Sequence, residues 1–242
     1  MGLTTMLDGV RILVLGEAGV GKTCFTDMFL KGDNFIYHHP FDEIRRRLPV
    51  NGKEWPLRPM DISSTMLREP GLGLDETIFN LSFAKSEGII LLYDITSRTS
   101  FDLVTQDAYI HALSTRHFMS TNNPNWGKRC GFVLVGNKVD ITTDSPGTRE
   151  VEREMAEEWA QSQGFRHIEV SSKNRAAVDE AMVMLVTSIE VARRRDERDK
   201  AAKKEARSKA RRPSLKSRIR STFVKSTQTS SVHGQAVRSP SL

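Results

Sequence analysis

The chain has 242 residues, enough for one large domain or two small ones. Its hydrophobic content of 38% and mean hydropathy of −0.41 indicate a globular core joined to a more polar segment. No run approaches the ~18 apolar residues of a membrane-spanning helix, and the first residues lack the pattern of a secretion signal. We therefore expect neither an integral membrane protein nor a secreted one, and we expect Cys24 and Cys130 to be buried free thiols of a reducing compartment.

Charge is distributed unevenly along the chain. The net charge is +6, yet residues 192–242 hold 16 Lys and Arg against 4 Asp and Glu, so this part carries +12 and the rest −6. A shift of this size indicates a domain boundary. We expect a globular domain at residues 1–195 and a basic, Ser-rich extension at residues 196–242, helical at first and then disordered.

Residues 16–23 fit the phosphate-binding loop G-x-x-x-x-G-K-[ST]. An apolar run suited to a buried strand precedes the loop, and a segment with apolar residues at helical spacing follows it. This order points backbone N–H groups and the positive end of a helix dipole at a phosphate. Lys22 would reach the outer phosphates and Thr23 would bind Mg²⁺, so both are candidate catalytic residues. The residues expected to contact nucleotide here are Gly16, Glu17, Ala18, Gly19, Val20, Gly21, Lys22, Thr23 and Cys24.

A hairpin is predicted next. Residues 46–50 and 53–55 flank Asn51-Gly52, a pair that favours a type I′ turn. Prolines within strands remove hydrogen-bond donors, so we expect irregular arms because of Pro49, Pro56 and Pro59.

Strands and helices then alternate. Apolar runs predict buried strands at residues 88–94, 132–136 and 167–170, and helical patterns cover residues 101–117 and 149–163. A last helix carries one apolar stripe: Val178, Ala181, Met182, Leu185, Ile189 and Ala192. Such alternation predicts a mostly parallel sheet covered on both faces.

Two further motifs complete a pattern. Residues 137–140 read Asn-Lys-Val-Asp, which fits N-K-x-D, and residues 169–173 read Glu-Val-Ser-Ser-Lys, similar to an S-A-K-type motif. With the phosphate loop, these motifs resemble those of Ras-like small GTPases over roughly residues 8–195. The resemblance implies an α/β fold of the P-loop NTPase class: a Ras-like, mostly parallel central sheet with helices on both faces, followed here by a basic C-terminal tail.

The resemblance also implies which residues bind guanine. The Asp140 carboxylate can accept hydrogen bonds from guanine N1–H and the exocyclic amine together, a donor pair that adenine lacks. Lys138 and Lys173 would pack on the two sides of the base, and backbone N–H groups near Ser172 would meet the guanine carbonyl. Phe35 would flank the base or simply pack within its loop. The nucleotide-binding residues expected beyond the phosphate loop are Phe35, Asp61, Asn137, Lys138, Asp140, Ser171, Ser172 and Lys173.

The two switch regions depart from the family pattern. Pro40-Phe41 stands where the family has Pro-Thr, and no Ser or Thr occurs from residue 27 to residue 62. Asp61 remains as the expected water-mediated Mg²⁺ partner beside Thr23. Ser64 and Thr65 replace the Gly and Gln of the second switch. We therefore predict intact GTP and GDP binding with Mg²⁺ but weak GTP hydrolysis.

The basic tail suggests a surface for an acidic partner. Basic residues interspersed with Leu215, Ile219 and Phe223 can bind anionic lipid, and no cysteine stands at the end for prenylation. We expect the last helix to continue towards Pro213, which would stop it. The alternatives are a solvated tail without a partner, nuclear localisation, or nonspecific nucleic-acid binding.

The sequence thus predicts a monomeric, cytoplasmic small GTPase-like protein of intracellular signal transduction, peripheral at the inner face of the plasma membrane. Its partners would be guanine nucleotide, an effector, an exchange factor, an activating protein and an anionic membrane surface, but not nucleic acid. The alternative is a nucleotide-locked or non-switching pseudo-GTPase scaffold whose tail binds membrane or another partner. An ATP-dependent enzyme is disfavoured by Asp140.

Overall fold

A computed structural model describes residues 9–32, 45–63, 76–122, 129–145 and 147–211. The chain divides after Asp196 into two units, Met1–Asp196 and Glu197–Leu242, and each is described by itself. None of the helices in the described ranges is long and apolar enough to cross a membrane.

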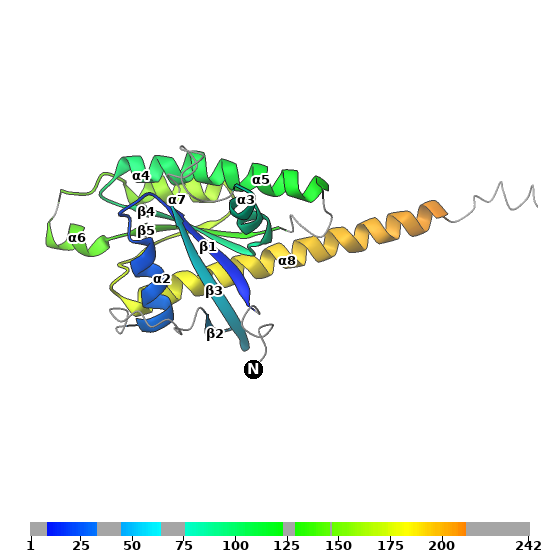
Figure 1. Ribbon diagram of the computed structural model, residues 1–242, viewed down its shortest axis with the longest axis horizontal. Helices are drawn as coiled ribbons and strands as arrows, with labels where there is room; N and C mark the ends of the chain where they lie inside the picture. Colours follow the sequence, from blue (N-terminus) through cyan, green and yellow to red (C-terminus); the bar gives the residue numbers. More distant parts are fainter. Residues whose placement is uncertain (1–8, 33–44, 64–75, 123–128, 146, 212–242) are drawn as a thin grey trace, which may run out of the picture. The chain divides into compact units, whose positions relative to one another are not determined.

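The first unit is built on a six-stranded sheet in the order β2-β3-β1-β4-β5-β6 (Figure 1). All neighbouring strands are parallel except β2 and β3, which are antiparallel. This arrangement confirms the predicted α/β fold of the Ras-like P-loop NTPase class. The strands are β1 (Val10–Gly16), β2 (Arg46–Val50), β3 (Lys53–Ser63), β4 (Gly88–Asp94), β5 (Gly131–Asn137) and β6 (Arg166–Glu169).

Helices cover both faces of this sheet, as its alternating side chains require. Along β1, Ile12 and Val14 join the core under α2 (Lys22–Lys31) and the first part of α8 (Arg175–Arg211). Leu13 and Leu15 join the opposite core. The helices that contribute to that second core are α3 (Glu76–Lys85), α4 (Arg98–Asp102), the π-helical segment η3 (Leu103–Ala108), α5 (Tyr109–Asn122) and α7 (Arg153–Ser162).

The predicted hairpin is present, but its arms are regular rather than irregular. Asn51 and Gly52 have φ of +53° and +73°, as a type I′ turn requires. The prolines are tolerated because each lies where a strand has a neighbour on one side only. Pro49 is in the edge strand β2, Pro56 pairs with β2 before β1 begins, and Pro59 pairs with β1 beyond Arg46, the first residue of β2.

Two predicted helices have different bounds. The helix expected at residues 101–117 starts at Arg98, passes through a π-helical segment at Leu103–Ala108 and continues as α5. The one expected at residues 149–163 begins only at Arg153. Its first residues are held outside the helix, because the amides of Glu150 and Val151 donate to the carbonyl of Ile95 at 3.0 and 3.1 Å.

The two cysteines differ in burial. Both are free thiols, but Cys24 is exposed and Cys130 is only partly buried, so the expectation of two buried thiols was wrong for Cys24 and holds only in part for Cys130. Helix α2 buries the face that carries Phe25, Met28 and Phe29, and Cys24 lies off that face. Burial raises the pKa of the Cys130 thiol to about 11.

The second unit is described over residues 197–211, which are helical. Residues 197–209 are exposed there, with an ion pair of 2.7 Å between Lys209 Nζ and Glu205 Oε1. The helix extends to Arg211, and Pro213 lies outside the described residues.

Candidate functional site

The site lies at the carboxyl edge of the parallel strands. Gly16 at the end of β1 aligns with Ser63 of β3, and Asp94 at the end of β4 aligns with Asn137 of β5. Residues distant in sequence therefore meet along one edge, which is where open parallel α/β sheets bind ligands.

The phosphate loop needs its glycines. Gly19 and Gly21 have φ of +81° and +97°, a region that side chains disfavour. A Cβ on Gly16 would lie 2.4 Å from the carbonyl oxygen of Leu92. One on Gly21 would lie 2.4 Å from Asn137 Nδ2. The loop can therefore fold back closely on the sheet edge only with glycine at these positions.

Lys22 begins α2 and turns its side chain across the loop. Its Nζ donates to the backbone carbonyl of Glu17 at 2.6 Å, and the residue is only 9% exposed. Burial lowers the pKa of Lys22, while the charges of Asp61 and Glu17 act in the opposite direction. The structure thus holds an ammonium group over the loop, where it can meet phosphate oxygens.

Thr23 and Asp61 meet between α2 and β3. The Thr23 hydroxyl donates to Asp61 Oδ2 at 2.6 Å. Within the described ranges, no group of three or more His, Cys, Asp or Glu side chains is placed to hold a metal. The oxygen pair still fits Mg²⁺, which takes few protein ligands and completes its shell with water and phosphate oxygens.

Asn137 connects three motifs. Its side-chain amide donates to the carbonyl of Val20 in the phosphate loop at 2.7 Å. Its Oδ1 accepts hydrogen bonds from the amide and the hydroxyl of Ser172, both at 2.9 Å. The side chain is buried, with 1% of the residue exposed. One side chain thus fixes the phosphate loop relative to the two segments predicted to bind guanine.

The two lysines of the predicted guanine-binding motifs each form an ion pair, Lys173 with Asp140 and Lys138 with Asp94 at the end of β4. Lys173 Nζ lies 2.7 Å from Asp140 Oδ2, and this hydrogen bond holds the pKa of Asp140 below its usual value. Lys138 adopts φ +71°, and its Nζ lies 2.7 Å from Asp94 Oδ2. We expected the stems of both lysines to pack on a base; the structure adds that their ammonium groups are anchored by carboxylates.

Asp94 is a site residue that the sequence motifs did not predict. Its Oδ1 also accepts from the amide and hydroxyl of Thr96 at 2.9 and 2.7 Å, which orients the carboxylate. Its position at the end of a buried strand could have indicated a role in the site. Strand β4 lies beside β5, which ends at Asn137, so the two strand ends meet at the same edge of the sheet.

A second set of contacts supports the loop after β6. Arg149 makes two hydrogen bonds to the Glu169 carboxylate, at 2.6 and 2.9 Å. Tyr93 Oη and His167 Nε2 are 2.9 Å apart. Both pairs tie β6 to its surroundings just before Ser171.

The remaining predicted residues are placed as follows. Ser171 is buried, and its hydroxyl accepts from the amide of Lys173 at 3.3 Å. Cys24 is exposed on the first turn of α2, and Ala18 is exposed in the loop. The predictions for Phe35, the first switch at Pro40-Phe41, and Ser64 and Thr65 of the second switch fall outside the described residues.

Comparison with known proteins gives a matching family. The Ras family model matches residues 11–191. Ras-related protein Rab-13 of Bos taurus is 30% identical over 183 residues, which cover 74% of this chain and 79% of the relative. GTP-binding protein yptV2 of Volvox carteri is 30% identical over 185 residues, covering 74% and 75%. Ras-like protein rasZ of Dictyostelium discoideum is 29% identical over 192 residues, covering 78% of each.

Proposed function

Since this chain belongs to the Ras family and is a small GTP-binding protein, we propose that it binds GTP and GDP with Mg²⁺, hydrolyses GTP slowly, and acts in intracellular signal transduction. The Asn137 network carries this proposal, because it joins the phosphate loop to Ser172 at the edge of the sheet where the N-K-x-D segment with Asp140 begins.

Each part of the site has a task. The amides of the phosphate loop and Lys22 would bind the phosphates. Asp140 would select guanine, with Lys138 and Lys173 held near it by Asp94 and by Asp140 itself. Mg²⁺, held by Thr23 directly and by Asp61 through water, would neutralise phosphate charge.

Slow hydrolysis follows from the departures in the switches. Phe41 has no side-chain oxygen to bind Mg²⁺, and Thr65 is too short to orient water as Gln does. Ser64 retains an amide, but its Cβ restricts the backbone relative to Gly. A ligand shifts a conformational equilibrium only by its differential affinity for the two states, so GTP and GDP should be poorly distinguished.

Competition binding and single-turnover hydrolysis test this proposal. Wild type should prefer guanine over adenine nucleotides, and Asp140→Asn should move the preference towards xanthine nucleotides. Hydrolysis should be slower than in a Ras protein with the usual Thr, Gly and Gln. Equal affinity for ATP and GTP would contradict the binding proposal. A rate equal to that of the reference protein would contradict slow hydrolysis.

The alternative function is a nucleotide-locked or non-switching scaffold. The same switch substitutions favour it, since they remove contacts to the third phosphate but leave the guanine motifs intact. Nucleotide retained on the purified protein, followed over time, separates the two functions. A scaffold would keep its nucleotide without turnover or would carry none at all.

We also propose that the basic extension attaches the protein to an anionic membrane on the cytoplasmic side. Residues 197–211 hold 7 Lys and Arg against 3 Asp and Glu. Each basic residue near such a membrane contributes about 1 kcal/mol. Sedimentation with vesicles should show binding that needs anionic lipid, weakens with salt and is lost when residues 197–242 are removed. Equal binding to neutral vesicles would contradict it.

A further inference from the structure

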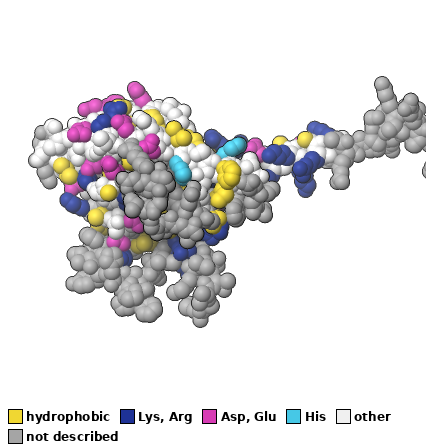
Figure 2. All heavy atoms as spheres, turned by 45° about the horizontal axis from the view of Figure 1, so that its top comes forward, with side chains coloured by type: hydrophobic (Ala, Val, Ile, Leu, Met, Phe, Trp, Pro, Cys, Tyr) yellow, Lys and Arg dark blue, Asp and Glu magenta, His cyan; other side chains and the backbone are white. Residues whose placement is uncertain are grey.

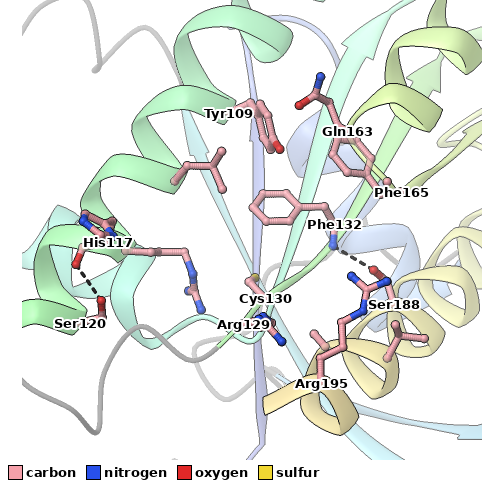
Figure 3. Close-up of a pocket in the computed structure, with 15 residues that line it drawn as sticks. Tyr109, His117, Ser120, Arg129, Cys130, Phe132, Gln163, Phe165, Ser188 and Arg195 are labelled. Carbon is pink, nitrogen blue, oxygen red and sulfur yellow. Dashed lines mark hydrogen bonds between the residues drawn. The ribbon is translucent and has the colours of Figure 1, made fainter. Parts of the chain in front are cut away.

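A hollow lies in the first unit at the amino end of β5, the end opposite to the nucleotide edge. It has a volume of about 340 Å³ and lies between α5, the start of β5, the α7–β6 connection and α8 (Figure 3). Neither the phosphate loop nor the guanine motifs contribute to its lining. It therefore has no part in the nucleotide chemistry described above.

Aromatic rings line one side of the hollow. The ring centroid of Tyr109 lies 5.5 Å from that of Phe132 and 5.6 Å from that of Phe165, and the two phenylalanines are 5.7 Å apart. Leu113 of α5 and Val191 of α8 also line the hollow and are 44% and 40% exposed. A large apolar side chain could be buried against these groups.

The charged lining is entirely basic. Arg116, Arg129, Arg195 and His117 line the hollow, and none of its 15 lining residues is Asp or Glu. Arg116 is buried and donates to the carbonyl of Phe83. The backbone amide of Arg129 donates to Asp196 Oδ2 at 2.8 Å, and its Nε lies 4.0 Å from Asp196 Oδ1. Arg195 is exposed and forms no ion pair with another described residue, whereas its neighbours Arg193 and Arg194 pair with Glu87 and Glu190.

Helix α5 also carries exposed apolar side chains that do not line the hollow. Ile110 and Phe118 of α5 are 62% and 65% exposed. Figure 2 shows hydrophobic side chains at the surface beside histidines.

We propose that this hollow, which we call the α5–α8 groove, binds an acidic peptide segment of a partner protein that carries one large apolar side chain. That side chain enters against the rings of Tyr109, Phe132 and Phe165. Flanking carboxylates meet Arg129 and Arg195, whose guanidinium groups suit carboxylates. The basic lining and the aromatic wall favour such a peptide over a lipid surface, which needs charge but no pocket for a side chain.

Peptide selection tests the proposal directly. Random heptapeptides on phage are selected on the full chain after depletion on the Leu113→Glu/Arg195→Glu variant, which retains the basic extension and so removes peptides that bind there. The selected sequences should place at least two Asp or Glu beside Phe, Leu or Trp. Failure to enrich after depletion, or a consensus without acidic residues, would overturn the proposal.

A selected peptide is then measured by fluorescence anisotropy with matched variants. Arg195→Glu should weaken binding at least tenfold, whereas the control Arg194→Glu should change it less than twofold, and both should keep the wild-type circular dichroism and melting temperature. Replacing the apolar peptide residue by Ser should also cost about tenfold. Equal effects of the two arginine variants would overturn the proposal. The proposal would also be overturned if the Leu113→Glu/Arg195→Glu variant lost vesicle binding or self-association but still bound the peptide.

Discussion

Tyr93 Oη of β4 and His167 Nε2 of β6 share a hydrogen bond of 2.9 Å. Strand β6 leads into the Ser171-Ser172 loop. His167 Nδ1 is buried and has no hydrogen-bond partner among the described residues. Burial lowers the pKa of His167 to about 4, although Glu169 and Glu157 act in the opposite direction. The folded protein therefore holds this imidazole neutral at neutral pH.

This pKa predicts a pH-dependent stability. The unfolded chain binds a proton at His167 near the ordinary pKa of 6.5, but the folded chain binds it only near 4. The free energy of unfolding should therefore decrease as the pH falls from 6.5 to 4, and His167 should contribute no slope above that window. Urea unfolding of His167→Gln should show a decrease smaller by about 2 kcal/mol, since Gln does not titrate.

Tyr93→Phe is the control for this measurement. It removes the hydrogen bond and should cost about 1 kcal/mol at every pH, but it leaves the imidazole buried and the slope in place. Identical slopes for wild type and His167→Gln would show that His167 is not the titrating group.

Asn137→Ala should damage stability and nucleotide binding together. The substitution leaves the carbonyl of Val20 and the amide of Ser172 without their side-chain partner, at a cost of about 3 kcal/mol. Thermal unfolding and the GDP dissociation constant measure both effects. Asn174→Ala is the matched control, because its side chain only accepts from the amide of Ala177 at 3.2 Å in an exposed position. An unchanged GDP affinity in Asn137→Ala would contradict the connecting role of Asn137.

Gly21→Ala should abolish nucleotide retention. The new Cβ meets Asn137 Nδ2 and also sits at φ +97°. Gly164→Ala provides the comparison, because Gly164 has φ +81° but no atom within 4 Å of an added Cβ. It should cost only the backbone strain, about 1 kcal/mol, and leave GDP retention intact. Equal losses of stability and retention would mean that strain alone explains Gly21.

Asp94→Asn should weaken GDP binding about fivefold, by losing the ion pair that holds Lys138. The side chain of Asp94 is only 10% exposed, so stability should also fall by about 1–2 kcal/mol. Asp102→Asn removes an exposed pair with Arg98 and should change neither quantity measurably. Isothermal titration measures the GDP affinity of both variants. If Asp94→Asn binds GDP as tightly as Asp102→Asn, Asp94 does not contribute to nucleotide binding.

Local sequence patterns predicted the fold and the motifs, because both are encoded in short stretches. The strand, loop and helix around Gly16 and the apolar runs of β4 and β5 needed no distant information. The missed features depend on pairing between distant segments. Asp94 meets Lys138 only because β4 and β5 are neighbours, and the prolines of β3 are tolerated only because its two partners overlap it incompletely.

Two other features were not predicted because the periodicity of apolar residues carries no information about them. The π-helical turn at Leu103–Ala108 lies within an otherwise helical pattern. Cys24 was expected to be buried because it follows the phosphate loop in an apolar helix, but its position is one residue away from the buried face that begins at Phe25.

The residues that Asn137 joins, Val20 and Ser172, are synthesised at different times. Val20 leaves the ribosome before Asn137 and Ser172, and at about 5–20 residues per second the interval is roughly 6–30 s. Strand β1 likewise lacks its neighbours until β3 and β4 have been made. A nascent chain halted before Ser172 therefore lacks the contact between Asn137 and Ser172 even though the phosphate loop and Asp140 have already been made.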